Sequence, residues 1–336
     1  MTDFKHLQAA HCENGVTTSL LQHYGVDFLT EPLSFGIGSG LFYIHIPFLK
    51  LNNGPSISYR SMPGLIFKRT CKALGIDVKR KKFSNPEKAQ AYLNTMIDAG
   101  KPVGCQVGVF HLPYFPPEYR FHFNAHNLIV YGREGDTYFV SDPIMESHNQ
   151  LSAKELEKVR FSKGVLAPKG QIYYPENVGI IDPKTVKIGI EKGIQKTAHD
   201  MVKIPIPFLG VKGIKYTANH IRKWRNKLGE RKAGLYLGQI VRMQEEIGTG
   251  GGGFRFIYAA FLQEAATLLQ MDELAVISED ITKAGDLWRA SAIQMAGIYK
   301  GRITAQSDFN TSAEMLDEIS DLEKAAFIKL GKLKFK

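Results

Sequence analysis

The sequence predicts an α+β N-terminal domain followed by a mostly α-helical C-terminal domain. Helical patterns alternate with short strand patterns up to about residue 175, and nearly every segment after Ile214 has helical periodicity. Between them, residues 175–215 are rich in Pro, Gly and Lys, which is typical of an inter-domain region. The 336 residues also exceed what one compact core usually holds. We therefore expect one domain over 1–180 and a second over 181–336.

The N-terminal elements follow from spacing and from glycines at helix ends. Apolar residues at helical spacing, each run closed directly by a glycine, predict helices over 12–24, 61–74 and 86–99. Alternating or β-rich patterns predict strands over 42–46, 76–82, 102–110, 126–131 and 137–141. The last two strands flank a turn-rich segment and form a predicted hairpin.

The C-terminal half is predicted to be helical. We expect an amphipathic helix over 254–270 and a long helix or a pair of helices over 272–299. The motif Thr311-Ser-Ala-Glu314 matches a capping box, which predicts that the last helix opens there.

Composition excludes several classes of protein. Three cysteines in a chain of this length argue against a disulfide scaffold and fit a reducing compartment. No run approaches the roughly 18 apolar residues of a membrane-spanning helix, and the N-terminal residues do not match a secretory signal. We therefore expect a cytoplasmic protein without membrane association.

The net charge of +10 is concentrated in one zone. Residues 184–232 hold thirteen Lys or Arg and three acidic residues, so the rest of the chain is balanced. Such a zone favours an acidic partner, although a solvated helix face would have the same composition. No recognisable nucleic-acid module accompanies it, so we do not expect a nucleic-acid partner.

Three residues form a candidate catalytic set. Cys12 opens a predicted helix, where backbone N–H groups and the helix dipole stabilise a thiolate. A thiolate nucleophile needs an imidazole partner, and His126 opens the first strand of the predicted hairpin. Asp142 ends the second strand, so it is expected beside His126 and able to orient its ring. A helix-borne Cys with a strand-borne His and Asp is the arrangement of papain-like enzymes. The alternative is a core histidine and an Asp-Pro turn.

The other candidate sites are weaker. Cys71 and Cys105 fall on apolar faces and read as core residues. His111, His122 and His126 with Cys12 do not lie on a predicted helix at the spacing of the usual metal ligands, so we expect no metal. The glycines at 36–40 have no strand before them and no helix after them, which excludes a dinucleotide-binding loop.

A second Gly-rich segment precedes the predicted helix at 254–270. The residues Gly250, Gly251, Gly252 and Arg255 lie where a helix N-terminus can hold an anion such as a phosphate. No P-loop Lys follows, and a flexible hinge explains the glycines equally well.

Several of these motifs together resemble a known family. The stretches His11–Glu13, Leu20–Gly25, Ser34–Gly40 and Ala125–Asn127 through Asp142-Pro143 are similar to the N-terminal domain of butirosin-biosynthesis protein H. Phe254–Glu264 and the glycines before it resemble the helical domain found with it. More distantly, the Cys, His and Asp-Pro pattern is similar to the peptidase domains of bacteriocin-exporting transporters.

The resemblance implies a papain-like fold and cysteine-dependent acyl transfer in natural-product (antibiotic) biosynthesis. An aminoacyl or acyl group would move from the phosphopantetheine thioester of an acidic acyl carrier protein to a small-molecule amine, with no cofactor bound by the chain itself. The residues implied are Cys12 as nucleophile, His126 as acid and base, and Asp142 as orienting group. The zone 184–232 would then dock the carrier, and the helical domain would shape the acceptor pocket or mediate a homodimer.

One departure concerns the oxyanion hole. Papain-like enzymes usually carry a Gln about six residues before the Cys, whereas position 6 here is His6 and the nearest glutamine is Gln8. Both residues are therefore candidates for the side-chain donor, beside the Cys12 backbone N–H. Two other functions remain open at this point: a cysteine peptidase or amidase with the same residues, and a non-catalytic papain-like binding module.

Overall fold

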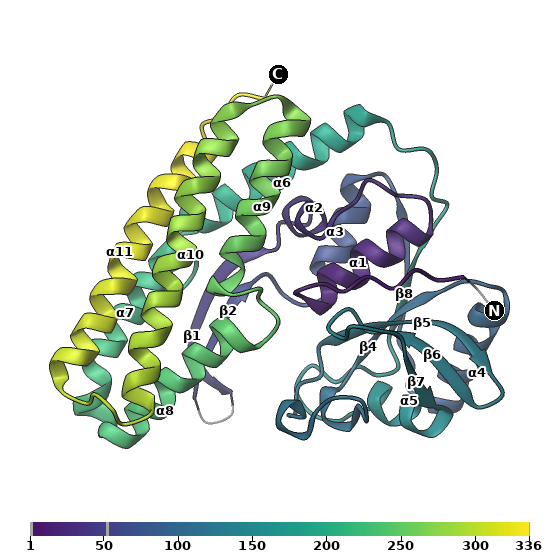
Figure 1. The fold of residues 1–336 in the computed structure, drawn as a ribbon, viewed down its shortest axis with the longest axis horizontal. Coiled ribbons are helices and arrows are strands. Elements are labelled where there is room, and N and C mark those ends of the chain that lie inside the picture. The colour runs from purple at the N-terminus through teal and green to yellow at the C-terminus, as the bar shows by residue number, and fades with distance from the viewer. Residues whose placement is uncertain (1–2, 52–53, 336) are drawn as a thin grey trace. The chain divides into compact units, whose positions relative to one another are not determined.

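Helices and strands alternate in the first half of the computed structural model, and helices follow in the second half (Figure 1). The structure describes residues 3–51 and 54–335. The helices are α1 (Cys12–His23), α2 (Glu31–Ile37), α3 (Leu65–Ala73), α4 (Pro86–Asp98), α5 (Ala153–Arg160), α6 (Pro183–Val202), α7 (Gly210–Leu228), α8 (Glu230–Val241), α9 (Arg255–Leu269), α10 (Asp272–Tyr299) and α11 (Gln306–Leu330). The strands are β1 (Leu41–Leu51), β2 (Gly54–Arg60), β3 (Asp77–Lys81), β4 (Val103–Val107), β5 (His126–Glu134), β6 (Thr137–Ser141), β7 (Asn149–Ser152) and β8 (Ile172–Glu176). Single helical turns are η1 (Val109–His111), η2 (Pro117–Tyr119), η3 (Arg242–Glu246) and η4 (Gly252–Phe254).

The chain divides into two compact units, each described below by itself. Unit 1 comprises Met1–Ser34 and Ile66–Thr185, and unit 2 comprises Phe35–Leu65 and Val186–Lys336. The second break lies five residues after the expected boundary at 180. The first break differs from the prediction, because residues 35–65 belong with the helices of unit 2 rather than with the N-terminal domain.

Unit 1 is built on a six-stranded antiparallel sheet in the order β3-β8-β4-β5-β6-β7. The predicted hairpin is confirmed as β5 and β6, in which Ile129 pairs with Ser141 and Glu134 with Thr137. Because side chains alternate across a strand, β5 contributes side chains to both faces of the sheet. Its residues Leu128 and Val130 join a buried core with α4 and α5. Helix α1 also packs against β5 (Figure 1).

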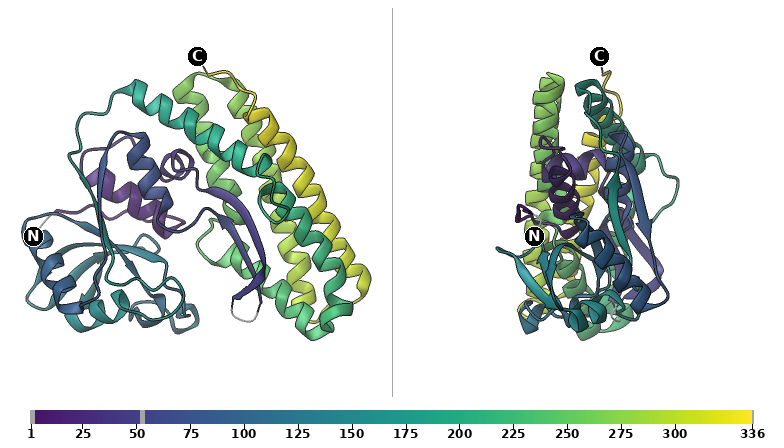
Figure 2. Two further views of the ribbon diagram at one scale, coloured as in Figure 1. Left: turned by 180° about the vertical axis from the view of Figure 1, so that it is seen from behind. Right: turned by 90° about the vertical axis from the view of Figure 1, so that its right-hand side faces the viewer.

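Unit 2 is a helical assembly with a two-stranded sheet, β1-β2. Helices α10 and α11 run side by side, as both views of Figure 2 show, and α7 contacts α11 and β1. The centre of this unit is aromatic: Tyr43 and Tyr59 from the two strands contact Trp288 of α10. The two strands therefore form part of the core of the helical unit.

Two sequence predictions in this half are corrected. Helix α6 is a regular helix of 20 residues inside the stretch that we expected to be an inter-domain region. Its Gly193 marks a close approach, since a Cβ there would lie 2.4 Å from the Gly36 carbonyl oxygen. The last helix begins at Gln306, before the expected capping box, and its first turn is closed by the Asp308 carboxylate accepting from the Ala305 N–H at 2.8 Å.

The long segment 272–299 is the single helix α10. No helix among the described residues is both long enough and apolar enough to cross a membrane.

Candidate active site

Cys12 is the first residue of α1, as the sequence predicts. His11 is the N-cap, and its Nδ1 accepts a hydrogen bond from the Asn14 N–H at 3.3 Å. The turn before the helix is held by Glu31, whose carboxylate accepts from the N–H groups of Ala10 and His11 at 3.0 and 2.9 Å. The first N–H groups of a helix have no partner inside it, and they place a positive partial charge around the sulfur. The local structure therefore favours an anion at Cys12.

His126 and Asp142 meet at the end of the β5–β6 hairpin. His126 Nε2 lies 2.7 Å from Asp142 Oδ2, and both side chains are buried. The second carboxylate oxygen of Asp142 accepts from the Ile144 N–H at 3.2 Å, which fixes the plane of the carboxylate. The expected side-by-side position of these two residues is thus found in the structure.

The electrostatics link all three predicted residues. Burial works to lower the pKa of His126, but the charges of Asp142 and Cys12 and hydrogen bonds to both raise it to about 10. A raised pKa means that the imidazole keeps its proton at neutral pH. The imidazole therefore interacts with both the carboxylate and the thiol, and it can act as the cation of a thiolate–imidazolium pair and later donate that proton.

Tyr114 is a fourth member of this network that the sequence analysis did not identify. Its hydroxyl donates to Asp142 Oδ2 at 2.9 Å, the same oxygen that contacts His126. Burial and the nearby Asp142 charge raise the pKa of Tyr114, so the group stays a neutral donor. Tyr114 lies in an irregular segment after η1, where no spacing pattern indicates a functional residue.

A close approach sets the position of α1 against the Asp142 turn. A Cβ at Gly15 would lie 2.4 Å from the Cβ of Pro143, and the Ala9 N–H donates to the Pro143 carbonyl at 2.8 Å. Real Cβ atoms do not come this close, so only glycine permits this packing. The Asp-Pro dipeptide therefore acts as a packing surface for the helix that carries Cys12.

His6 and Gln8, which the sequence suggests as side-chain donors of the oxyanion hole, make no hydrogen bond to Cys12 within the described part of the chain. The ring nitrogens of His6 contact Ser141 Oγ at 2.8 Å and the Met145 carbonyl at 3.0 Å, so they are engaged beside the hairpin. Gln8 is exposed. The amide that does reach the sulfur belongs to Asn127, whose Nδ2 lies 3.9 Å from Cys12 Sγ.

The expected anion site at the second Gly-rich segment is occupied from within the chain. The Arg255 guanidinium is buried and forms a bidentate ion pair with Glu323, with both N···O distances 2.8 Å. The Gly252 N–H donates to the Glu245 carboxylate at 3.1 Å, and the Gly251 N–H donates to the Thr249 hydroxyl at 3.1 Å. Gly250 is exposed. These contacts give the segment a structural role in unit 2.

The remaining cysteines are core residues, as expected. Cys71 and Cys105 are fully buried, and burial raises the pKa of both thiols, that of Cys105 to about 11. Among the described residues, no group of three or more His, Cys, Asp and Glu side chains is arranged to hold a metal ion.

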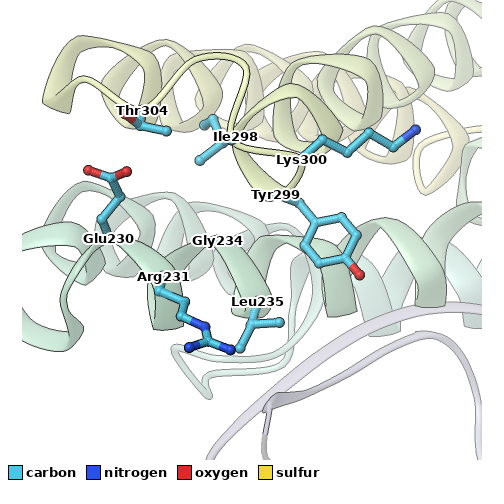
Figure 3. Close-up of a pocket in the computed structure, with 9 residues that line it drawn as sticks. Glu230, Arg231, Gly234, Leu235, Ile298, Tyr299, Lys300 and Thr304 are labelled. Atoms are coloured by element: carbon cyan, nitrogen blue, oxygen red, sulfur yellow. The ribbon is translucent and has the colours of Figure 1, made fainter.

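Unit 2 also contains a pocket of about 350 Å³ (Figure 3). It lies between the start of α8, with Glu230 and Arg231, and the end of α10, with Tyr299 and Lys300. Glu230 and Arg231 belong to the basic zone 184–232, and none of the lining residues was predicted to be catalytic or anion-binding.

Comparison with known proteins adds the following findings. Residues 11–143 match the family model "Butirosin biosynthesis protein H, N-terminal". Residues 154–330, over half of the chain, match "Domain of unknown function (DUF4872)". A crystal structure described as a putative C39-like peptidase from Bacillus anthracis is similar at 14% identity and a TM-score of 0.36, over 54% of this chain and 96% of that one. The comparison with curated proteins gave no match. The chain therefore belongs to the DUF4872 family, and its residues 11–143 are similar to the N-terminal domain of butirosin biosynthesis protein H.

Proposed function

We propose that this protein is a cysteine-dependent acyltransferase of natural-product biosynthesis. It moves an acyl or aminoacyl group from the thioester of an acyl carrier protein to a small-molecule amine, through an acyl-enzyme on Cys12. The observation that carries the proposal is the buried His126–Asp142 pair at 2.7 Å, together with a thiol at the start of α1 whose charge helps to raise the pKa of His126. It is supported by the family of residues 11–143, which is named for a biosynthesis protein.

The mechanism follows from these groups. The Cys12 thiolate attacks the thioester carbonyl, and the Cys12 backbone N–H at the start of α1 stabilises the oxyanion that forms. When the intermediate collapses, the phosphopantetheine sulfur leaves and takes the proton from His126. The amine then attacks the acyl-enzyme while His126 accepts its proton, and the Cys12 thiolate leaves. Asp142 holds the ring in one orientation during both steps.

The basic zone 184–232 supplies a docking surface for an acidic carrier in this proposal. Part of it is neutralised inside unit 2, since Lys215 pairs with Asp321 and Arg222 with Asp317. The helix α6 presents further lysines to solvent, including Lys187 and Lys192. We place the docking surface on α6 for this reason, because acidic carriers are attracted over distances comparable with the Debye length.

The test is intact-protein mass spectrometry after mixing the protein with acyl carrier thioesters of varied acyl groups. Wild type is expected to gain the mass of the acyl group, Cys12→Ala is not, and an added amine removes the adduct as an acylated amine. Release of the free acid only, from a peptide or amide donor, would instead indicate a peptidase or amidase. An inert Cys12, without adduct from any thioester and without alkylation by iodoacetamide, would indicate a binding module.

A further inference from the structure

The proposed chemistry leaves one requirement unmet by the predicted residues. A tetrahedral oxyanion is stabilised best by two preorganised donors, and the N–H of Cys12 is only one. His6 is engaged with Ser141 and Met145, and Gln8 is exposed. A second donor has to come from a side chain that already lies close to the sulfur.

Asn127 is such a side chain. It follows His126 on β5, is 5% exposed, and places Nδ2 3.9 Å from Cys12 Sγ. Neighbouring residues of a strand point to opposite faces, so the side chains of His126 and Asn127 leave β5 in different directions. The Asn127 amide therefore does not take the place of the His126 ring.

The orientation of the amide is fixed by its other contacts. Tyr173 on β8 donates its hydroxyl to Asn127 Oδ1 at 2.9 Å, and Asn127 Nδ2 donates to the Ala125 carbonyl at 3.1 Å. A donor at the oxygen and an acceptor at the nitrogen allow only one of the two amide orientations. That orientation directs the second N–H of Nδ2 toward the sulfur, so the donor is in place before a substrate binds.

We propose that Asn127 is a catalytic residue that donates its side-chain N–H to the oxyanion and replaces the missing glutamine of the papain-like pattern. This inference rests on the proposed acyl-enzyme but not on the identity of donor or acceptor. When the Cys12 sulfur bonds to the carbonyl carbon, the carbonyl π electrons move to the oxygen. Asn127 Nδ2 and the Cys12 N–H hold that charge until the C=O bond re-forms and the leaving group departs with its electron pair.

The test compares two reactions of the same thiolate. Acylation by p-nitrophenyl acetate passes through an oxyanion and releases p-nitrophenolate in a burst, whereas alkylation by iodoacetamide is a direct displacement without an oxyanion. We expect Asn127→Ala to slow the acylation burst by about 10²–10³-fold. The alkylation rate of Cys12 is expected to stay within about threefold of wild type, because the His126–Asp142 pair is untouched.

Two matched variants accompany it. Asn124→Ala removes another buried asparagine of unit 1, whose amide binds the carbonyls of Lys163 and Val165, and is expected to leave both rates unchanged. Tyr173→Phe frees the Asn127 amide to rotate and is expected to slow acylation alone, by about tenfold. If Asn127→Ala fails to fold, Asn127→Ser serves in its place, with the same expected fall.

Three results would overturn the inference: a wild type without a burst, an Asn127 variant with wild-type acylation, or equal losses in acylation and alkylation. The last would mean that Asn127 only stabilises the thiolate. A wild-type burst that depends on Asn127, in a protein that never accepts a carrier thioester, would leave this inference standing and reject the proposed carrier donor.

Discussion

Replacing Asp142 by Asn tests the electrostatic basis of the candidate site. The substitution keeps the size of the side chain but removes the charge 2.7 Å from His126 Nε2, inside a buried pair. Burial works to lower the pKa of His126, and the Asp142 charge is the largest of the influences that raise it to about 10. Asp142→Asn removes that charge while burial still works to lower the pKa of His126. The pKa of His126 is therefore expected to fall in the variant.

The expected magnitude is large for reactivity and measurable for stability. Loss of the oriented imidazolium is expected to slow alkylation of Cys12 at pH 7.5 by about 10²–10⁴-fold. Both proteins should be compared from about pH 7 to 9, a range in which the raised pKa of His126 keeps the wild-type imidazole protonated.

The pH dependence of the free energy of unfolding tests the same ion pair, and the direction of the change follows from the raised pKa of His126. The pKa of His126 is raised on folding, so its stabilising contribution is complete below about pH 6.5 and is lost as the pH rises through about 10. Over that window the folded state holds the extra proton, and the free energy of unfolding falls by up to about 1.4 kcal/mol per pH unit. Asp142→Asn should flatten this slope in urea titrations, and the control Asp136→Asn at the exposed hairpin turn should not. An unchanged slope together with wild-type alkylation would refute the ion-pair reasoning.

Three further outcomes are expected. Tyr114→Phe removes one hydrogen bond from Asp142 and should slow Cys12 alkylation several-fold, less than Asp142→Asn does; an equal loss would show that Tyr114 does more than orient the carboxylate. Glu323→Ala leaves the buried Arg255 unpaired and should reduce the free energy of unfolding by about 3–5 kcal/mol in denaturant titrations, so a change under 1 kcal/mol would contradict the buried ion pair. Carrier-dependent turnover should fall as salt rises from low to about 0.5 M, and constant turnover would count against docking on 184–232.

The sequence predicts those parts of the site that depend on local signals. Helix α1 has apolar spacing and a closing glycine, and the β5–β6 hairpin has alternation and a turn, so the positions of Cys12, His126 and Asp142 follow from their elements. The antiparallel pairing then brings the last two together over 16 residues of chain. The contact of His126 with Asp142 therefore requires no knowledge of distant parts of the chain.

The sequence analysis did not identify Asn127 and Tyr114, because their roles depend on contacts with residues far away in the sequence. Asn127 gains its role only from Tyr173, 46 residues away, and from Cys12, 115 residues away. Tyr114 gains its role from Asp142 across an irregular segment. An asparagine or tyrosine has no local pattern that separates such a role from an ordinary one. The tertiary structure is needed to find them.

Two predictions based on glycines in unit 2 are wrong for a related reason: the contacts of these glycines also depend on the tertiary structure. The Pro, Gly and Lys of 175–215 predict an inter-domain region, whereas this stretch contains the regular helix α6, which uses Gly193 to approach the backbone at Gly36. The same residue type at 250–252 was read as an anion-binding loop, and its N–H groups are instead bound by side chains of the chain itself. The number of glycines in a segment does not show which of them pack closely against another part of the chain.

The two units divide the proposed reaction into steps that can be measured separately. Every residue assigned to acyl-enzyme formation, including Asn127, lies in unit 1, while most of the charge expected to dock a carrier lies in unit 2. A small aryl ester needs only the first set, because it carries no protein to be docked. A carrier thioester needs both. A charge reversal at exposed lysines of α6 that slows turnover with the carrier, but leaves the aryl ester burst intact, therefore assigns recognition to unit 2 and chemistry to unit 1.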